Sequence, residues 1–263
     1  MLKRILLPNK EYIPVDQLVN KGRQYLPLAV LRLMARELKQ ESYLYRATNL
    51  TRCPAQAYLQ TILDYDIALE DLYISSFRGA FVHSLLEVEM REDPDHVIEV
   101  RFKSEVGGKI VSGKVDNYNK ETKTLIDYKS IKDSTSPKYL PKEQQLKQME
   151  VYTYLLDKAG YPVDRVIIEY IGMSTWMRCS FKGNRTTVFY ITNGAWNMMG
   201  SKHHLKKIPE IEKWMIKAVK VLAKAESTGK IPKPEPSGLC DYKNRKQKNY
   251  CPVKFACPEW AVE

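Results

Sequence analysis

The sequence predicts a mixed α/β fold in which a small β-sheet is flanked by helices. Three observations predict it: apolar residues recur at helical spacing near both ends of the chain, the period changes to strand-like alternation near residue 97, and polar turns separate the segments that follow. With 263 residues, of which 44% are hydrophobic, the chain can bury a sizeable core as one large domain or as a domain with appendages.

Helices are expected in the first third of the chain. Residues 1–50 are expected to form a helical extension whose apolar positions recur at threes and fours, with an interruption at Pro27. A second helix is expected directly after Cys53, because Pro54 is well accepted in the first turn of a helix. A third helix is expected over residues 76–91, where aromatic and aliphatic side chains again share one face.

Strands and two further helices are expected in the rest of the chain. Alternation of apolar and polar residues, turns that contain glycine and a final amphipathic stretch set their bounds. In order, we expect strands at 97–102, 109–116 and 124–130, a helix at 142–158, a strand at 165–171, a hairpin of 176–181 and 186–191, and a helix at 209–228.

Two acids and a lysine in residues 113–130 carry the strongest indication of chemistry. Ten residues separate Asp116 from Asp127, and Lys129 follows on the same strand. Because two short apolar-rich segments flank a polar turn, both acids are expected at neighbouring strand ends. Two carboxylates suit a hard divalent cation, and the lysine can orient water or offset phosphate charge. The pattern therefore favours metal-assisted phosphodiester cleavage, with a surface ion pair as the alternative.

Three polar residues on expected helices are further candidates. His83 is a suitable ligand for Mn²⁺ if its helix packs over the sheet, and otherwise it is structural or exposed. Gln148 and Tyr152 are four residues apart and therefore share one helix face. They can contact DNA or support the lysine; the alternative is a solvated glutamine and a half-buried tyrosine.

The five cysteines fall into two groups. Cys179 alternates with apolar residues of an expected strand, which is typical of a core thiol. The other four can hold zinc or an iron–sulfur cluster, or they can be ordinary thiols; they are Cys53, Cys240, Cys251 and Cys257. Their spacings contain no Cys-x-x-Cys, which disfavours a zinc ribbon.

The charge balance favours a polyanionic partner. Lysine and arginine total 42 and the acids total 31, so the formal net charge is +11. Nucleic acid is the simplest such partner, and a solvated basic surface is the alternative. Basic clusters at 202–207 and 243–248, the second interleaved with Tyr242, Tyr250 and Phe255, suit phosphate contact and base stacking on single-stranded DNA.

No membrane association is expected. The longest uncharged apolar run near the start, residues 25–31, is too short to span a bilayer. Pro8 and Lys10 break any signal-peptide core. We therefore expect an intracellular, cytoplasmic protein.

Six motifs in order along the chain resemble the PD-(D/E)XK nuclease superfamily. They are Cys53-Pro54, Gly79-x-x-x-His83, Asp116, Asp127-x-Lys129, Gln148-x-x-x-Tyr152, and the three cysteines Cys240, Cys251 and Cys257. Within that superfamily the chain resembles the RecB-like nucleases, and among these the CRISPR-associated "Cas four" iron–sulfur exonucleases and their phage relatives. The resemblance runs from about residue 45 to residue 258.

The resemblance implies a restriction-endonuclease-like core and four parts of the chain. These are an N-terminal helical extension (1–50), a helix that carries the first cluster cysteine (51–75), the nuclease core (76–195), and a C-terminal helix with a cysteine-rich cluster segment (196–263). It implies a [4Fe-4S] cluster on Cys53, Cys240, Cys251 and Cys257, with Zn²⁺ as the alternative.

The resemblance also implies the activity, which is that of a Mn²⁺- or Mg²⁺-dependent deoxyribonuclease. The metal ligands would be His83, Asp116, Asp127 and the backbone carbonyl of Tyr128, and the catalytic residues would be Asp116, Asp127, Lys129, Gln148 and Tyr152. The expected substrate is single-stranded DNA, degraded from the 5′ end.

The cellular role implied by the resemblance lies in CRISPR adaptation and antiviral defence, or in DNA recombination and repair. It would be carried out with other proteins of those systems, in the cytoplasm of a prokaryotic cell or a phage-infected host. Oligomeric state stays open. Two alternatives also stay open: a non-catalytic nucleic-acid-binding adaptor on a nuclease fold, and a zinc-stabilised, structure-specific endonuclease.

Overall fold

The structure is a computed structural model in which the chain divides into two compact units. Residues 1–44, 52–81 and 221–263 form the smaller unit, and residues 45–51 and 82–220 form the larger one. The residues that the structure describes are 2–38, 43–73, 81, 83–84, 88–89, 92–172, 174–183, 185–192, 195–235 and 251–258.

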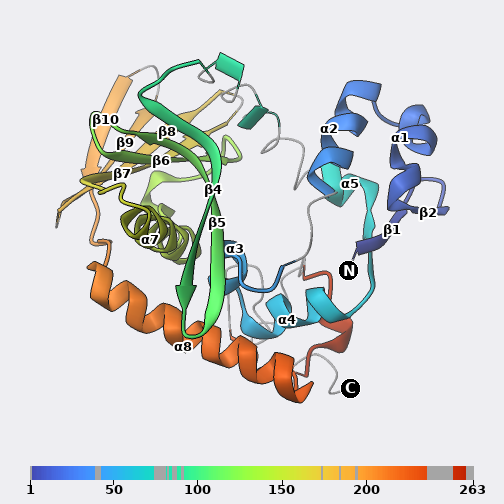
Figure 1. The fold of residues 1–263 in the computed structure, drawn as a ribbon. Helices are drawn as coiled ribbons and strands as arrows, with labels where there is room; N and C mark the ends of the chain where they lie inside the picture. The colour runs from blue at the N-terminus through green and yellow to red at the C-terminus, as the bar shows by residue number, and fades with distance from the viewer. Residues whose placement is uncertain are drawn as a thin grey trace. The chain divides into compact units, whose positions relative to one another are not determined.

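A seven-stranded mixed sheet forms the larger unit (Figure 1), with the strand order β10-β9-β8-β7-β6-β5-β4. Among the described strands of this sheet, β6 and β7 pair in parallel and the other neighbours are antiparallel. The strands are β4 (His96–Val106), β5 (Lys109–Asn119), β6 (Thr124–Ser130), β7 (Arg165–Ile171), β8 (Trp176–Lys182), β9 (Arg185–Thr192) and β10 (Ala195–Gly200). The mixed α/β fold class is thereby confirmed.

The helix α7 (Glu143–Lys158) connects the two parallel strands, because parallel neighbours require a crossover that a hairpin cannot supply. It packs against the sheet (Figure 1) and comes very near β5 at Gly113. A Cβ atom at this position would lie 2.7 Å from Tyr152 Cε1 and 2.9 Å from Leu155 Cδ1. Glycine is therefore what allows this helix to lie directly on the strand that carries Asp116.

The helix α8 (Ile208–Thr228) belongs to the larger unit up to Lys220. A buried acid of α7, Glu150, connects the two helices. Its carboxylate accepts hydrogen bonds from the backbone N–H of Lys206 at 3.1 Å and from Trp214 Nε1 at 3.0 Å. Burial of this charge is tolerated because several donors converge on it.

The smaller unit contains a three-stranded sheet of order β2-β1-β3 and short helices. Its elements are β1 (Leu2–Leu6), β2 (Tyr12–Pro14), η1 (Val15–Gln17), α1 (Leu18–Lys21), η2 (Gly22–Gln24), α2 (Leu28–Leu38), α4 (Pro54–Ile62), β3 (Tyr65–Ala68), α5 (Leu69–Leu72) and η5 (Lys254–Ala256). One core gathers Ile5, Ile13, Leu31 and Met34, and a second gathers Leu59, Cys251 and Val253. Two short elements, α3 (Ala47–Leu50) and η4 (Pro137–Tyr139), belong to the larger unit.

The expected elements around the two acids agree closely with the observed ones. The expected strands at 124–130 and 165–171 coincide with β6 and β7, and the helix after Cys53 is α4. The expected helical extension over residues 1–50 agrees with α1 and α2, but it was wrong for residues 2–14, where β1 and β2 are strands. The strand β1 pairs with β3, about 60 residues away, so this pairing has no local periodic signal.

Two further points concern the expected helices and strands. The strand β10 was not expected, because its sequence Ala-Trp-Asn-Met-Met-Gly shows no alternation. The helix expected over residues 76–91 lies largely outside the described residues, although His83 has helical backbone. Among the described residues, none of the helices combines the length and the apolar content that a membrane crossing requires.

Candidate metal centre

Asp116 and Asp127 lie side by side where two strands of the sheet part. The pairing of β5 with β6 ends at Asn117 and Ile126, so the acids occupy the next positions on diverging strands. The backbone N–H of Tyr128 donates a hydrogen bond to Asp116 Oδ2 at 2.9 Å. Both carboxylates are buried, with exposed fractions of 8% for Asp116 and 0% for Asp127. The two carboxylates are thus held close together with almost no exposure to solvent.

Lys129 neutralises one of the two acids. It lies two residues after Asp127 on β6 and therefore on the same face of the strand. Its Nζ lies 3.0 Å from Asp127 Oδ1, to which it donates a hydrogen bond, and 2.8 Å from Oδ2. The buried Oδ2 accepts no well-aligned hydrogen bond from any described residue. This oxygen is therefore close to one positive charge but retains capacity for another electrophilic partner.

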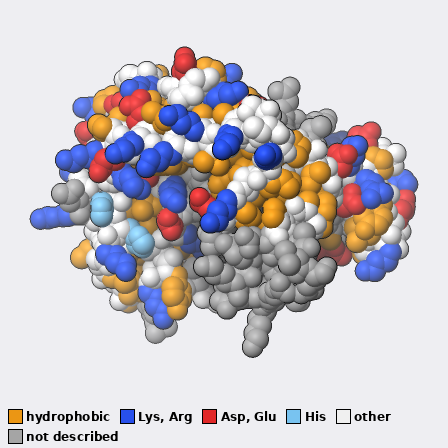
Figure 2. Space-filling model, turned by 90° about the horizontal axis from the view of Figure 1, so that it is seen from below, with side chains coloured by type: hydrophobic (Ala, Val, Ile, Leu, Met, Phe, Trp, Pro, Cys, Tyr) orange, Lys and Arg blue, Asp and Glu red, His pale blue; other side chains and the backbone are white. Residues whose placement is uncertain are grey.

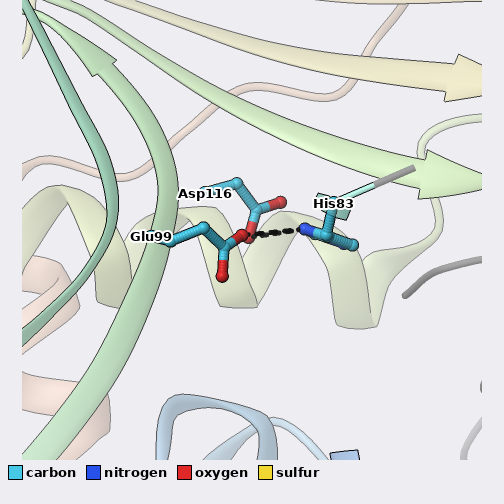
Figure 3. A group of neighbouring side chains, drawn as sticks. All are labelled: His83, Glu99 and Asp116. Atoms are coloured by element: carbon cyan, nitrogen blue, oxygen red, sulfur yellow. Dashed lines mark hydrogen bonds and ion pairs between the residues drawn. The ribbon is translucent and has the colours of Figure 1, made fainter. Parts of the chain in front are cut away.

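His83 and Glu99 complete a second group of ligating atoms around Asp116 (Figure 3). His83 Nδ1 lies 3.0 Å from Glu99 Oε1 and 3.6 Å from Asp116 Oδ1. The ligand atoms of these three residues all lie within 4.8 Å of one another. Lys114 forms an ion pair with the other oxygen of Glu99. The imidazole and the two carboxylates can hold a metal ion.

The electrostatics of the centre show an excess of negative charge. Burial, followed by repulsion from Asp127, raises the pKa of Asp116 to about 7. Burial alone would lower the pKa of His83. The hydrogen bond to Glu99 and the charge of Asp116 outweigh this effect, so the pKa of His83 is raised. Burial also lowers the pKa of Lys129, and the nearby charge of Asp127 outweighs this effect. A proton or a cation at Asp116 therefore offsets this excess negative charge.

Gln148 and Tyr152 lie on the face of α7 that is turned toward the acids. Gln148 Nε2 donates a hydrogen bond to Tyr152 Oη at 2.7 Å, as their four-residue spacing allows. Burial, and then the charges of Asp116 and Asp127, raise the pKa of Tyr152 well above its usual value. The hydroxyl therefore stays protonated beside the two carboxylates.

The cysteines are distributed over both units. Cys53, Cys251 and Cys257 are buried in the smaller unit, and Cys240 lies outside the described residues. The backbone N–H of Glu235 donates to Cys53 Sγ at 3.4 Å. Cys179 is fully buried on β8 of the larger unit, in keeping with a core thiol.

Basic side chains are prominent on the surface. Figure 2 shows many lysine and arginine side chains, with histidine among them, on the face seen from below. In the cluster at 202–207, Lys206 is engaged with Glu150, with its Nζ 3.2 Å from Glu150 Oε1. The second cluster, 243–248, lies outside the described residues together with Tyr242 and Tyr250; the remaining aromatic residue, Phe255, is 62% exposed.

Sequence reasoning missed Glu99 and its partner Lys114. The only available signal was the register of a hairpin. With the turn at Gly107 and Gly108, counting back along the two strands places residue 99 opposite Asp116. A glutamate in a strand of alternating polar residues has no feature that distinguishes it from a solvated one.

The fold and the site together define a mixed α/β protein in which two acids of the sheet and a nearby histidine can hold a metal ion. No family model matches the chain, and no curated protein matches it.

The solved structures that are similar to the chain include the following two. The crystal structure of SSO0001 is 18% identical in sequence, with a TM-score of 0.52, over 88% of this chain and 94% of that chain. This likeness shows a shared fold. A phage related exonuclease from Haemophilus somnus 129PT is 12% identical, with a TM-score of 0.31, over 82% of this chain and 94% of that chain.

Proposed function

We propose that the protein is a metal-dependent deoxyribonuclease with a PD-(D/E)XK centre. The observation that carries the proposal is the convergence of Asp116, Asp127 and Lys129 where β5 and β6 part. The order of six sequence motifs supports the same conclusion. A surface ion pair, which was the alternative for Asp127 and Lys129, does not agree with a carboxylate that has no exposed surface.

The donor set fits a hard divalent cation. The ligands would be His83, Asp116, Asp127 and the backbone carbonyl of Tyr128, which are three oxygen donors and one imidazole. Two features support the fit: Asp127 has a buried oxygen without a well-aligned hydrogen bond, and burial, followed by repulsion from Asp127, raises the pKa of Asp116, so that a cation beside it would be favoured. When bound, Mn²⁺ or Mg²⁺ supplies Lewis acidity toward a phosphodiester and toward water.

In this proposal, the residues around the metal centre have separate roles. Lys129 keeps its proton because its pKa is raised, so it can donate a hydrogen bond to a phosphate oxygen or orient a water molecule. Tyr152, held by Gln148 and protonated, can donate its hydroxyl toward the same phosphate or support the lysine. Asp116 and Asp127 remain oriented by the Tyr128 N–H and by Lys129, respectively.

DNA is the proposed substrate, and single-stranded DNA degraded from the 5′ end is the proposed form. The net charge of +11 supports a polyanionic substrate. Strand preference, polarity and a role in CRISPR adaptation or in recombination are supported by the motif resemblance. Partner proteins of those systems belong to the same proposal.

We further propose an iron–sulfur cluster on Cys53, Cys240, Cys251 and Cys257. Three of these residues are buried in one unit although about 200 residues separate the first from the last. An N–H donor to Cys53 Sγ resembles the hydrogen bonds that stabilise cluster sulfurs. The guanidinium of Arg52, next to Cys53, lies close enough to Cys251 for the two groups to interact electrostatically.

Digestion of DNA tests the proposed activity. Single- and double-stranded oligonucleotides labelled at the 5′ or the 3′ end are incubated with the protein and Mn²⁺, Mg²⁺ or EDTA. We expect degradation of the single strand with either metal and none with EDTA. Asp127→Asn and Lys129→Met should be inactive, whereas Asp164→Asn, at an exposed acid, should be fully active. Full activity of the Asp127 or Lys129 variant would refute the site. Metal-loaded protein that binds DNA without cutting it would indicate a non-catalytic adaptor.

Anaerobic purification tests the cluster. We expect a brown protein with about four iron atoms per chain, as a [4Fe-4S] cluster requires. Cys251→Ala should lose the colour, and Cys179→Ala, at the buried cysteine of the other unit, should keep it. A colourless protein that contains zinc would favour the zinc alternative.

A further inference from the structure

Glu99 has a backbone conformation that glutamate rarely adopts. Its φ angle is +56°, in the left-handed region where a side chain crowds the backbone. The strand β4 continues on both sides of this residue, and its pairing with β5 keeps a constant register across it. The conformation is therefore local to Glu99, and something in the fold maintains it.

The left-handed residue turns the strand so that Glu99 faces inward. Val100, which follows it, is 41% exposed, and Arg101 is exposed as well. The side chain of Glu99 is only 11% exposed and is directed at His83 and Asp116 (Figure 3). The alternation of the strand is thus interrupted at the position where a carboxylate reaches the centre.

The distances from His83 Nδ1 to the two carboxylate oxygens are close to those between adjacent ligands of one ion. Adjacent ligands of an octahedral ion with bonds of about 2.1 Å lie roughly 3 Å apart. His83 Nδ1 lies 3.0 Å from Glu99 Oε1 and 3.6 Å from Asp116 Oδ1. Asp116, which is more than nine-tenths buried, has no hydrogen bond to Oδ1 among the described residues, while its Oδ2 is bonded to the Tyr128 N–H. One carboxylate oxygen of Asp116 is thus directed at the imidazole and at Glu99.

The ion pair with Lys114 leaves one oxygen of Glu99, Oε1, available to a metal ion. The ammonium pairs with Oε2, and Oε1 is the atom that faces His83. Ligating carboxylates commonly have their second oxygen held in this way. The ion pair also offsets part of the added negative charge, so that a third acid beside Asp116 and Asp127 is tolerated.

We propose that Glu99 is a further ligand of the divalent cation, bound through Oε1 together with His83 and Asp116. This inference rests on the proposed function, because it extends the ligand set of the same centre. It differs from the set that the sequence motifs imply, which contains no residue of β4. The chemistry of recognition is that of a hard cation with one imidazole nitrogen among carboxylate oxygens, which suits Mn²⁺.

Calorimetric titration of the metal-free protein with MnCl₂ tests the proposal without reference to nuclease activity. Glu99→Gln keeps the shape of the side chain and removes its charge, and we expect Mn²⁺ binding to weaken at least about tenfold. Glu105→Gln, an exposed acid on the same strand, serves as the matched control and should bind as the wild type does. If Glu99→Gln does not fold, Glu99→Gly replaces it, because glycine accepts the left-handed backbone without crowding.

A double-variant comparison separates direct ligation from a positioning role. In the background of His83→Asn, Glu99→Gln should still weaken Mn²⁺ binding, because a direct ligand contributes a bond that does not depend on the imidazole. The two effects are not expected to be additive, since the two side chains are in contact. If the effect of Glu99→Gln disappears when His83 is already replaced, Glu99 acts only through the imidazole and the ligand assignment is wrong.

Asp116→Asn separates this inference from the proposed function. Loss of Mn²⁺ binding in Asp116→Asn with unchanged binding in Glu99→Gln would overturn the role of Glu99 alone. Unchanged binding in both variants would overturn the metal centre itself.

Discussion

Replacement of Asp116 by asparagine should remove a pH dependence from the stability of the metal-free protein. The native carboxyl keeps its proton up to a pKa of about 7, whereas an unfolded aspartate loses it near pH 4. Between these values the native state binds more protons than the unfolded state, so the free energy of unfolding falls as the pH rises. The raised pKa of His83 acts in the same direction in the wild type, since its stabilisation is lost as pH rises through that pKa.

The magnitude follows from the two pKa values of Asp116. Between pH 5 and pH 8 the wild type should lose about 2 to 3 kcal/mol through this carboxyl. Asp116→Asn can still accept the hydrogen bond from the Tyr128 N–H, so the variant preserves the local structure and lacks the titration. The stability difference between wild type and variant should therefore shift by that amount in favour of the variant as the pH rises.

Urea unfolding in EDTA at pH 5, 6, 7 and 8, followed by tryptophan fluorescence, measures this shift. Three of the four tryptophans, Trp176, Trp196 and Trp214, report on the larger unit. Asp164→Asn, at an exposed acid, should differ from the wild type by a constant amount. Equal losses of stability in the wild type and in Asp116→Asn would show that Asp116 is not protonated in the native state. Added Mn²⁺ should stabilise the wild type more at pH 8 than at pH 5, because the ion then displaces no proton.

Three further predictions concern the packing around the centre. Gly113→Ala should lower stability by about 1 to 3 kcal/mol in thermal unfolding, because α7 must move away, whereas Gly200→Ala, which meets open space, should have little effect. Lys129→Met should lower the free energy of unfolding in urea by about 3 to 5 kcal/mol, because it leaves the buried charge of Asp127 unpaired. Adding Asp127→Asn should restore part of this loss. A double variant as unstable as Lys129→Met alone would contradict the prediction. Glu150→Gln should lower the unfolding free energy by about 1 to 3 kcal/mol, since charged and neutral donors converge on the carboxylate, and an unchanged value would be evidence against that network.

The segments that carry the acids were predictable because their signals are local. The alternation in residues 124–130 and the run of β-branched residues at 165–171 set β6 and β7 without any knowledge of their partners. The four-residue spacing of Gln148 and Tyr152 fixed their common face on α7. Outside the core, β1 and β2 were missed because their pairing depends on β3, which lies far along the chain.

The sequence by itself determined that Asp116 lies on one strand and Asp127 and Lys129 on the next, because a short polar turn joins the two strands. The two-residue spacing of Asp127 and Lys129 places both side chains on one face of their strand. Only the tertiary structure decided that the strands diverge at these acids, that α7 closes over Gly113, and that Glu99 joins the centre. The reason is physical: the position of Glu99 depends on a single left-handed residue within a strand and on the register of β4 against β5, and neither is encoded in a periodic pattern.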